Sequence, residues 1–321
     1  MVSVSEGNNA EVQNDMAQIH IVLTTYNGEK YIREQLDSLL ENDFKDIYIE
    51  VCDDGSSDGT VQIVREYTER YDCIGFHQNE KNLGYTMNFM EGIRRSRSPY
   101  IMLCDQDDIW HRDKIRKTYE RMKQLEQENT EKMPLMVFTD AMNFDSEDGK
   151  ELGSFHKTSH LDVEKLDTAH LFMENKCIGC TIMINAEVRN YLRVLPQEIR
   201  VHDWWLALIC SHFGKISYIE ETTLHYRQHS GNMIGGSSYF DDIKNRLSHL
   251  HKQRAVIRAT VAQGCAFYEV FGKELPEEKR ETAFQFAQMS KMGILGRRKA
   301  MLQYGFCKSG LIRNVALFLL I

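Results

Sequence analysis

Short apolar runs alternate with stretches of helical periodicity through the first half of the chain. An apolar, β-branched run that stops at Asn, Asp, Gly or Ser predicts a strand, and apolar residues spaced by three or four positions predict a helix. The expected strands are 19–25, 47–52, 73–77, 100–104 and 136–139. The expected helices between them are 29–40, 61–71, 84–95 and 113–128.

Four strand–helix units in succession predict an α/β fold, with a doubly wound, mostly parallel sheet of Rossmann-like type and helices on both faces. The second half of the chain is less regular. We expect a strand over 178–185 with a kink at Gly179, and a buried, aromatic-rich helix over 203–213. A strand over 222–227 should lead into a polar loop over 228–236, and a helical appendage should begin near residue 240.

This pattern divides the chain into three parts. A polar, acidic tail over 1–17 lacks apolar periodicity, so we expect it to be flexible. A domain over 18–239 contains the sheet, and its first half ends near residue 140. The region 240–321 is helical and basic: from Lys244 onward it has 14 Lys and Arg against 5 Asp and Glu, a net charge of +9.

Charge narrows the partners that the chain can have. The 321 residues include 39 Lys and Arg and 47 Asp and Glu, a net charge of −8, so the part before Lys244 carries −17. Because phosphate neutralisation needs a basic face, nucleic acid is not an expected partner. The basic end predicts a peripheral membrane contact; alternatively, its closing apolar run, 315–321, packs on the domain or on a second copy of the chain.

The cysteines and the N-terminal sequence indicate the cellular compartment in which the protein is expected. The eight cysteines are scattered, and the CxxC of Cys177 and Cys180 has no second pair, so neither a disulfide framework nor a structural zinc site is expected. No run approaches the ~20 apolar residues of a membrane-spanning helix, and the N-terminus lacks the apolar stretch of a signal peptide. These features predict a cytoplasmic protein, possible membrane contact being on the inner face.

Polar clusters follow the predicted strands at the edge where parallel sheets bind ligands. Asp105 and Asp107 can approach one hard divalent cation from the same side, which suits Mn²⁺ or Mg²⁺ shared with a diphosphate. A solvated acidic loop is the alternative. Neither GxGxxG nor GxxxxGK[ST] occurs, so a metal is expected to carry the diphosphate charge in place of a glycine-rich loop.

A second carboxylate pair follows the strand over 47–52. Asp54 can accept hydrogen bonds from a nucleobase or a ribose, and this is the role we expect for it. Asp58 is better explained as the cap of the helix that starts at Thr60, because Asp is a preferred N-cap residue.

Two clusters in the second half carry further candidate chemistry. Asp203 is a candidate general base beside a sugar-binding surface made by Trp204 and Trp205, the alternative being that it caps its helix. Arg227 and His229 follow a strand, where a fixed cation and an imidazole can hold a leaving phosphate. Either residue alone is more often structural.

Four motifs in order now suggest a family. IHIVLTTYNGEKY, EVCDDGSSDGT, NLGYTMNF and YIMLCDQDDIW, which span about 95 residues, resemble a family 2 glycosyltransferase of the GT-A fold. The later segments HDWW and YRQHSGN resemble the bacterial rhamnosyltransferase branch that builds cell-wall or capsular polysaccharide. The resemblance extends to about Gly235 and does not cover the last 80 or so residues.

The resemblance implies roles for residues of the first half. Thr24 and Tyr26 match the positions that contact the nucleobase, the tyrosine by stacking, and Asp54 matches the aspartate that binds the base. The residues that match the segment lining the nucleotide site are Asn82, Gly84 and Asn88.

The resemblance also implies the metal and the base. Asp105 and Asp107 match the metal-binding DxD, the last aspartate being the direct ligand. Asp203 matches the catalytic base, although the family more often has Glu before it and this chain has His202. Arg227 and His229 match a loop that closes over the diphosphate.

The implied activity is an inverting, metal-dependent glycosyl transfer. The donor implied is a nucleotide-diphosphate sugar, with L-rhamnose from dTDP-rhamnose as the best match, and the acceptor is a hydroxyl of a glycan or lipid-linked glycan. Asp203 would take the acceptor proton, while Mn²⁺ or Mg²⁺ neutralises the leaving diphosphate. A sugar nucleotidyltransferase would need a glycine-rich basic loop after the first strand, whereas a non-catalytic nucleotide-sugar sensor differs only in lacking turnover.

Overall fold

The computed structural model describes residues 17–228 and 250–321. Within these ranges the strands form one nine-stranded sheet of order β3-β2-β1-β4-β8-β6-β9-β5, with β7 paired to β6. The strands are β1 (Ile19–Thr25), β2 (Ile47–Asp53), β3 (Ile74–Gln78), β4 (Tyr100–Cys104), β5 (Ile109–Trp110), β6 (Leu135–Asp145), β7 (Glu151–Ser154), β8 (Met183–Asn185) and β9 (Lys215–Gln228).

The first four strands are all parallel, as their strand–helix alternation predicts. β8 runs antiparallel between β4 and β6, β9 lies parallel to β6, and β5 pairs antiparallel with β9. The prediction of a doubly wound, mostly parallel α/β sheet is therefore confirmed.

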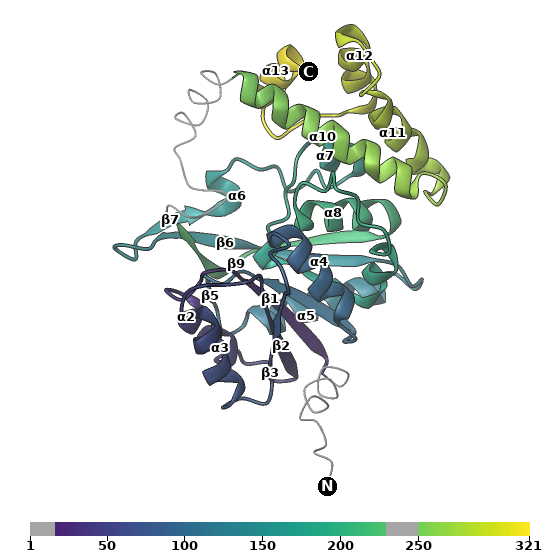
Figure 1. Ribbon diagram of the computed structural model, residues 1–321. Helices are drawn as coiled ribbons and strands as arrows, with labels where there is room; N and C mark the ends of the chain where they lie inside the picture. The colour runs from purple at the N-terminus through teal and green to yellow at the C-terminus, as the bar shows by residue number, and fades with distance from the viewer. Residues whose placement is uncertain (1–16, 229–249) are drawn as a thin grey trace.

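Helices cover both faces of the sheet (Figure 1). The helices are α2 (Ile32–Leu40), α3 (Thr60–Thr68), α4 (Tyr85–Arg95), α5 (Lys114–Glu128), α6 (Phe155–Thr158), α7 (Thr168–Met173), α8 (His202–Phe213), α10 (Leu250–Phe271), α11 (Glu277–Gln288), α12 (Ile294–Tyr304) and α13 (Leu311–Leu320). Two short 3₁₀ turns are η1 (Gly179–Thr181) and η2 (Ala186–Tyr191).

The period-two alternation of each strand separates two apolar clusters. Ile21 and Leu23 of β1 pack with α2, α3 and α5, whereas Val22 between them faces α4 and α8. The second cluster continues outward through α7 into α10 and α11, where Phe267 and Phe286 are fully buried. Figure 1 shows α10 to α13 stacked on this side, away from α2 and α3.

Several elements differ from the sequence prediction. The segment predicted as one strand over 178–185 begins as η1, in which the Thr181 hydroxyl donates to the Ile178 carbonyl at 2.7 Å, and becomes β8 only at Met183. The strand predicted over 222–227 is the last part of the 14-residue β9. The N-cap of α3 is Gly59, and Asp58 accepts the Thr60 N–H at 3.0 Å without being the cap.

Parts of the predictions fall outside the described ranges. These are the tail up to residue 16, nearly all of the polar loop over 228–236, and His229. Among the helices of the described residues, none has both the length and the apolar character needed to cross a membrane.

Candidate active site

Three loops meet at the carboxyl edge of the parallel strands. Thr25 at the end of β1 is paired with Asp53 at the end of β2, and Leu23 is paired with Cys104 at the end of β4. This register brings the segments after β1, β2 and β4 together, because parallel strands end at one edge of the sheet. The predicted ligand-binding motifs therefore lie side by side.

Gln106 joins the first loop to the third. Its side-chain oxygen accepts hydrogen bonds from the Thr25 hydroxyl at 2.7 Å and from the Tyr26 N–H at 2.9 Å. A Cβ atom on Gly28 would lie 2.3 Å from the same oxygen, so a larger residue there would displace the Gln106 side chain. The middle residue of the DxD is thus a structural link between the two loops.

The loop after β1 presents Tyr26 to solvent with half of its surface exposed, while Thr24 is buried at the end of the strand. Asn27 has a left-handed backbone, with φ of 49°, which Asn tolerates better than most residues. Its side-chain oxygen accepts the Ser57 N–H at 2.8 Å, which ties this loop to the one after β2. An exposed tyrosine on a fixed loop suits stacking on a base.

Asp54 holds the start of α4. Its carboxylate accepts the N–H groups of Leu83 and Gly84, each at 2.8 Å, and the side-chain amide of Asn79, also at 2.8 Å. Gly84 has φ of 78°, a conformation that favours glycine. Asn82 donates to the Asp54 carbonyl at 3.0 Å. The carboxylate predicted to contact the nucleobase therefore also fixes the shape of the loop before α4.

Asn88 belongs to the same buried network. Its amide donates to the Cys52 carbonyl at 2.8 Å, and its oxygen accepts from Asn79 at 2.9 Å. With 1% of its surface exposed, Asn88 supports the loops around the site from below.

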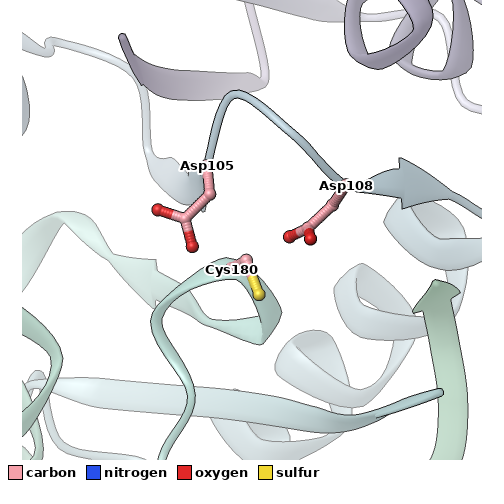
Figure 2. Close-up of side chains that lie close together, drawn as sticks. All are labelled: Asp105, Asp108 and Cys180. Atoms are coloured by element: carbon pink, nitrogen blue, oxygen red, sulfur yellow. The ribbon is translucent and has the colours of Figure 1, made fainter. Parts of the chain in front are cut away.

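Asp105, Asp108 and Cys180 form a cluster at the end of β4. One potential ligand atom from each lies within 4.8 Å of the others. Figure 2 shows both carboxylates pointing beneath the arch of their shared loop toward Cys180, which comes from a separate segment. Asp107, the second aspartate of the predicted metal pair, is not a member of this group.

Burial governs the protonation of these carboxyls. Desolvation, together with the negative charges of Asp107 and Asp203, raises the pKa of Asp105 to about 7. Desolvation, together with the charges of Asp107 and Asp105, raises the pKa of Asp108 well above its usual range. One oxygen of Asp108 is buried without a hydrogen-bond partner among the described residues.

Arg227 lies in β9, within the strand predicted over 222–227 and not in the loop that the resemblance implied. Its guanidinium donates to the Asp107 carbonyl at 2.7 Å, pairs with Glu34 and lies 4.6 Å from the centre of the Tyr31 ring. Its backbone N–H donates to Asp108 at 3.3 Å. Because Arg227 is 6% exposed and held on several sides, it fixes the DxD loop from the β9 side. The strand predicted from the pattern is confirmed at this residue, and the loop placement that the resemblance implied is wrong, since β9 extends to Gln228.

Asp203 lies in the first turn of α8 and faces the same acidic region. Val201, and not Asp203, occupies the N-cap position. The carboxylate accepts the Trp204 N–H at 2.6 Å, yet desolvation outweighs such hydrogen bonds and raises its pKa to about 6. A carboxylate with a pKa near neutrality is suited to accept a proton at physiological pH.

The neighbouring His202 is buried in its neutral form and packs against an aromatic ring. Its ring stacks on Phe89 with centroids 3.9 Å apart. Burial lowers the pKa of His202 to about 3, and neither ring nitrogen has a hydrogen-bond partner within the described part of the chain. A neutral, fixed imidazole beside Asp203 helps to exclude water from that carboxylate.

Residues 20–130 match the family model described as Glycosyl transferase family 2. Over these residues the chain is similar to the members of this glycosyltransferase family. It is 29% identical over 238 residues to the dTDP-rhamnosyl transferase RfbG of Shigella flexneri, covering 70% of this chain and 78% of that protein.

Two solved structures have the same fold as this glycosyltransferase. S. aureus TarS 1–349, crystallised with UDP-GlcNAc, superposes with a TM-score of 0.53 at 16% identity and covers 89% of each chain. The mannosyltransferase PcManGT of Pyrobaculum calidifontis, in complex with GDP-Man and Mn²⁺, gives a TM-score of 0.50 at 13% identity, covering 95% of this chain and 87% of that one. The predictions of the GT-A fold and of a glycosyltransferase are confirmed.

The expectation that Trp204 and Trp205 form a sugar-binding surface is wrong, because both indoles are buried. Trp205 is fully buried against Phe267, and Trp204 is 5% exposed, with its indole N–H donating to the Leu171 carbonyl at 2.5 Å. An aromatic-rich helix start does not distinguish a sugar-binding surface from a core contact, and here Trp205 packs on α10 while Trp204 is bonded to α7.

Three residues near the site were not singled out from the sequence. Gln106 and Asp108 flank the predicted ligands, and their roles depend on contacts with β1 and β9 that are distant in sequence. Cys180 reaches the cluster from η1, which the sequence did not predict. The run of three carboxylates in DQDD was the available signal for Asp108.

Proposed function

We propose that this glycosyltransferase moves a sugar from a nucleoside diphosphate donor to a hydroxyl of a glycan acceptor, with inversion at the anomeric carbon. The supporting observation is the position of Asp203: its charge raises the pKa of Asp105, so the candidate base and the DxD loop face the same space. An inverting reaction needs a base on the acceptor side and charge compensation on the leaving-group side.

The donor we infer is dTDP-L-rhamnose. This rests on the relative from Shigella flexneri, whose name gives that donor class, and on the HDWW and YRQHSGN segments. We infer a glycan or lipid-linked glycan acceptor in cell-wall, capsule or O-antigen polysaccharide synthesis. Exposed Tyr26 and buried Thr24 at the end of β1 would contact the nucleobase of the donor. The segment that contains Asn82 and Asn88 would lie beside them.

The donor set at the DxD fits a divalent metal. The charges of Asp107 and Asp203 both act on Asp105, so these carboxylates gather in one region, and one buried oxygen of the adjacent Asp108 lacks a partner among the described residues. Carboxylate oxygens suit Mn²⁺ or Mg²⁺, and a structure of similar fold contains Mn²⁺. We propose that Asp105 and Asp107 hold this ion, which when bound supplies a Lewis acid for the diphosphate.

The protein's own residues then perform three tasks. Asp203 accepts the proton of the attacking hydroxyl, which makes the acceptor oxygen more nucleophilic as it forms its bond to the anomeric carbon. The Arg227 side chain holds the Asp107 backbone, so the DxD loop keeps its shape as the charge on the leaving group grows. His202 and Phe89 shield the base from water.

The experiment is Asp203→Asn, assayed with a panel of nucleotide sugars that includes dTDP-rhamnose. We expect unchanged donor binding and a loss of turnover on the order of 10²–10⁴-fold, because Asn keeps the shape of the side chain but cannot accept the proton. Asp167→Asn is the matched control, since Asp167 also lies at a helix start but caps α7, and it should keep full activity.

The pH profile gives a second measurement of the same residue. Asp203 acts as a base only when ionised, and its pKa is raised to about 6. The wild-type kcat should therefore fall about tenfold for each pH unit below about 6 and level off above it. Normal turnover by Asp203→Asn, or a flat profile to pH 5, would overturn the base assignment, and donor binding without turnover in the wild type would indicate a sensor.

A further inference from the structure

The outer faces of α12 and α13 carry most of the exposed apolar surface. Of the twelve large apolar side chains that are exposed in the described residues, seven lie between positions 294 and 319. They are Ile294, Leu295, Leu302, Leu311, Ile312, Val315 and Leu319. Contiguous exposed apolar surface of this kind marks a site of interaction.

The apolar residues of α13 form a stripe that the fold leaves uncovered. Leu311, Val315 and Leu319 follow one another at four-residue spacing and are 80%, 52% and 65% exposed. Leu317 and Ile321 on the opposite side are buried in the second apolar cluster. The helix therefore has two apolar faces, of which only one packs on the protein.

The same stretch has no acidic residue. From position 282 to the end, the sequence contains six Lys and Arg and not one Asp or Glu. Arg313 is compensated by Glu174 at 3.0 Å, whereas Lys291 and Lys299 are exposed. Arg298 donates to the Phe318 carbonyl at 2.8 Å, which places the basic segment of α12 against the end of α13.

We propose that the outer faces of α12 and α13 dock the protein on an anionic lipid bilayer. The apolar stripe would enter the boundary between headgroups and acyl chains, and the basic residues would meet the lipid phosphates. Charge selects this occupant over a second copy of the chain, because two such faces would bring like charges together with no carboxylate from this stretch to pair with them. Figure 1 shows both helices at the end of the molecule beyond α10.

The test is co-sedimentation of the full-length protein with vesicles, without donor or acceptor. With equimolar phosphatidylglycerol and phosphatidylcholine, the wild type should pellet, and added salt should release it. Pure phosphatidylcholine vesicles should bind it much more weakly. Because no turnover is measured, the result is independent of the proposed transfer reaction.

Two variants separate the apolar and the charge contributions. Leu311→Gln/Val315→Gln/Leu319→Gln should abolish pelleting. Lys291→Glu/Lys299→Glu should weaken binding at least about 25-fold, at about fivefold for each lysine lost. The matched controls, Leu152→Gln/Val194→Gln and Lys132→Glu/Lys150→Glu, alter exposed residues elsewhere and should bind as the wild type does.

All of these variants change exposed positions, so unchanged melting temperatures should show that they fold. Light scattering then measures the mass of the wild type and of the apolar variant in solution, which tests whether a second copy of the chain covers this face. Failure of the wild type to bind the anionic vesicles, or undiminished binding by either the apolar variant or the lysine variant, overturns the proposal. If the wild type is a dimer and the apolar variant is a monomer that still binds vesicles, the face is an interface with a second copy of the chain.

Discussion

At the scale of single residues, two overlapping sets of side chains are candidate ligands for the proposed metal. The sequence motif points to Asp105 with Asp107, whereas the side chains that lie closest together are Asp105, Asp108 and Cys180. Exposure distinguishes them: Asp108 is 1% exposed and accepts the Arg227 N–H, whereas Asp107 is partly exposed. A ligand shared with a diphosphate must be reachable from the donor side, so we favour the pair from the motif.

This choice predicts different outcomes for two substitutions. Asp107→Ala should abolish the Mn²⁺-induced rise in melting temperature and reduce turnover on the order of 10²–10³-fold, comparable to the loss of other fixed charge stabilisers. Asp108→Asn should keep both, because the amide oxygen can still accept the Arg227 N–H. The reverse pattern would identify the buried cluster as the metal site, and normal turnover after metal chelation would exclude a metal requirement.

The residue assignments show where sequence reasoning stops. The residues at strand ends, such as Asp105 and Asp54, could be located from the pattern because a strand followed by polar residues fixes their place in a parallel sheet. Their contacts could not be located. Asp54 binds two backbone N–H groups from the loop before α4, and Arg227 reaches the DxD loop from 120 residues away.

At the scale of elements, strands were predictable where a mostly apolar run is buried on both faces and stops at polar residues. β1 and β4 have the predicted bounds for this reason, although β1 contains the buried His20. β5 has two residues and β7 is mostly exposed, so neither has a pattern to detect. Polar residues within β6 and β9 hid their full lengths, which the parallel pairing of the two strands supports.

The loop between β4 and β5 depends on the Gln106 link to β1. Gln106→Ala removes the acceptor for the Thr25 hydroxyl and the Tyr26 N–H. We expect weaker donor binding, with a stability loss of only about 1–2 kcal/mol, since the freed groups are partly exposed to water. Donor titration calorimetry and urea unfolding measure the two effects separately.

Gly28→Ala provides an independent check on this link, because its Cβ would displace the same Gln106 oxygen. Both variants should therefore impair donor binding, and the double variant should lose little more than either alone. Full additivity of the two losses would contradict the idea that they act through one contact.

At the scale of the whole molecule, the C-terminal helices share a core with the sheet domain. Phe267 of α10 contacts Trp205 of α8 and Phe172 of α7, with ring centroids 5.4 and 5.8 Å apart. We predict that residues 18–239 and 240–321 unfold together. Phe267→Ala should cost about 3–5 kcal/mol, and urea unfolding should show a single transition by both tryptophan fluorescence and circular dichroism.

The control for this prediction is Leu295→Ala, which alters an 81% exposed residue of α12 and should leave the unfolding midpoint almost unchanged. Two separate transitions in the wild type, or a Phe267→Ala protein that loses only the helical signal, would show that the C-terminal region is an independent unit.

The pairing of β5 with β9 has a consequence for how the enzyme is made. Strands β1 to β4 are complete once residue 104 has been synthesised, but β5 has its partner only when β9, which ends at Gln228, has left the ribosome. The loop that holds Asp105 to Asp108 lies directly before β5 and is fastened by Arg227. A nascent chain thus completes the loop of the proposed metal ligands late, after most of the protein has been translated.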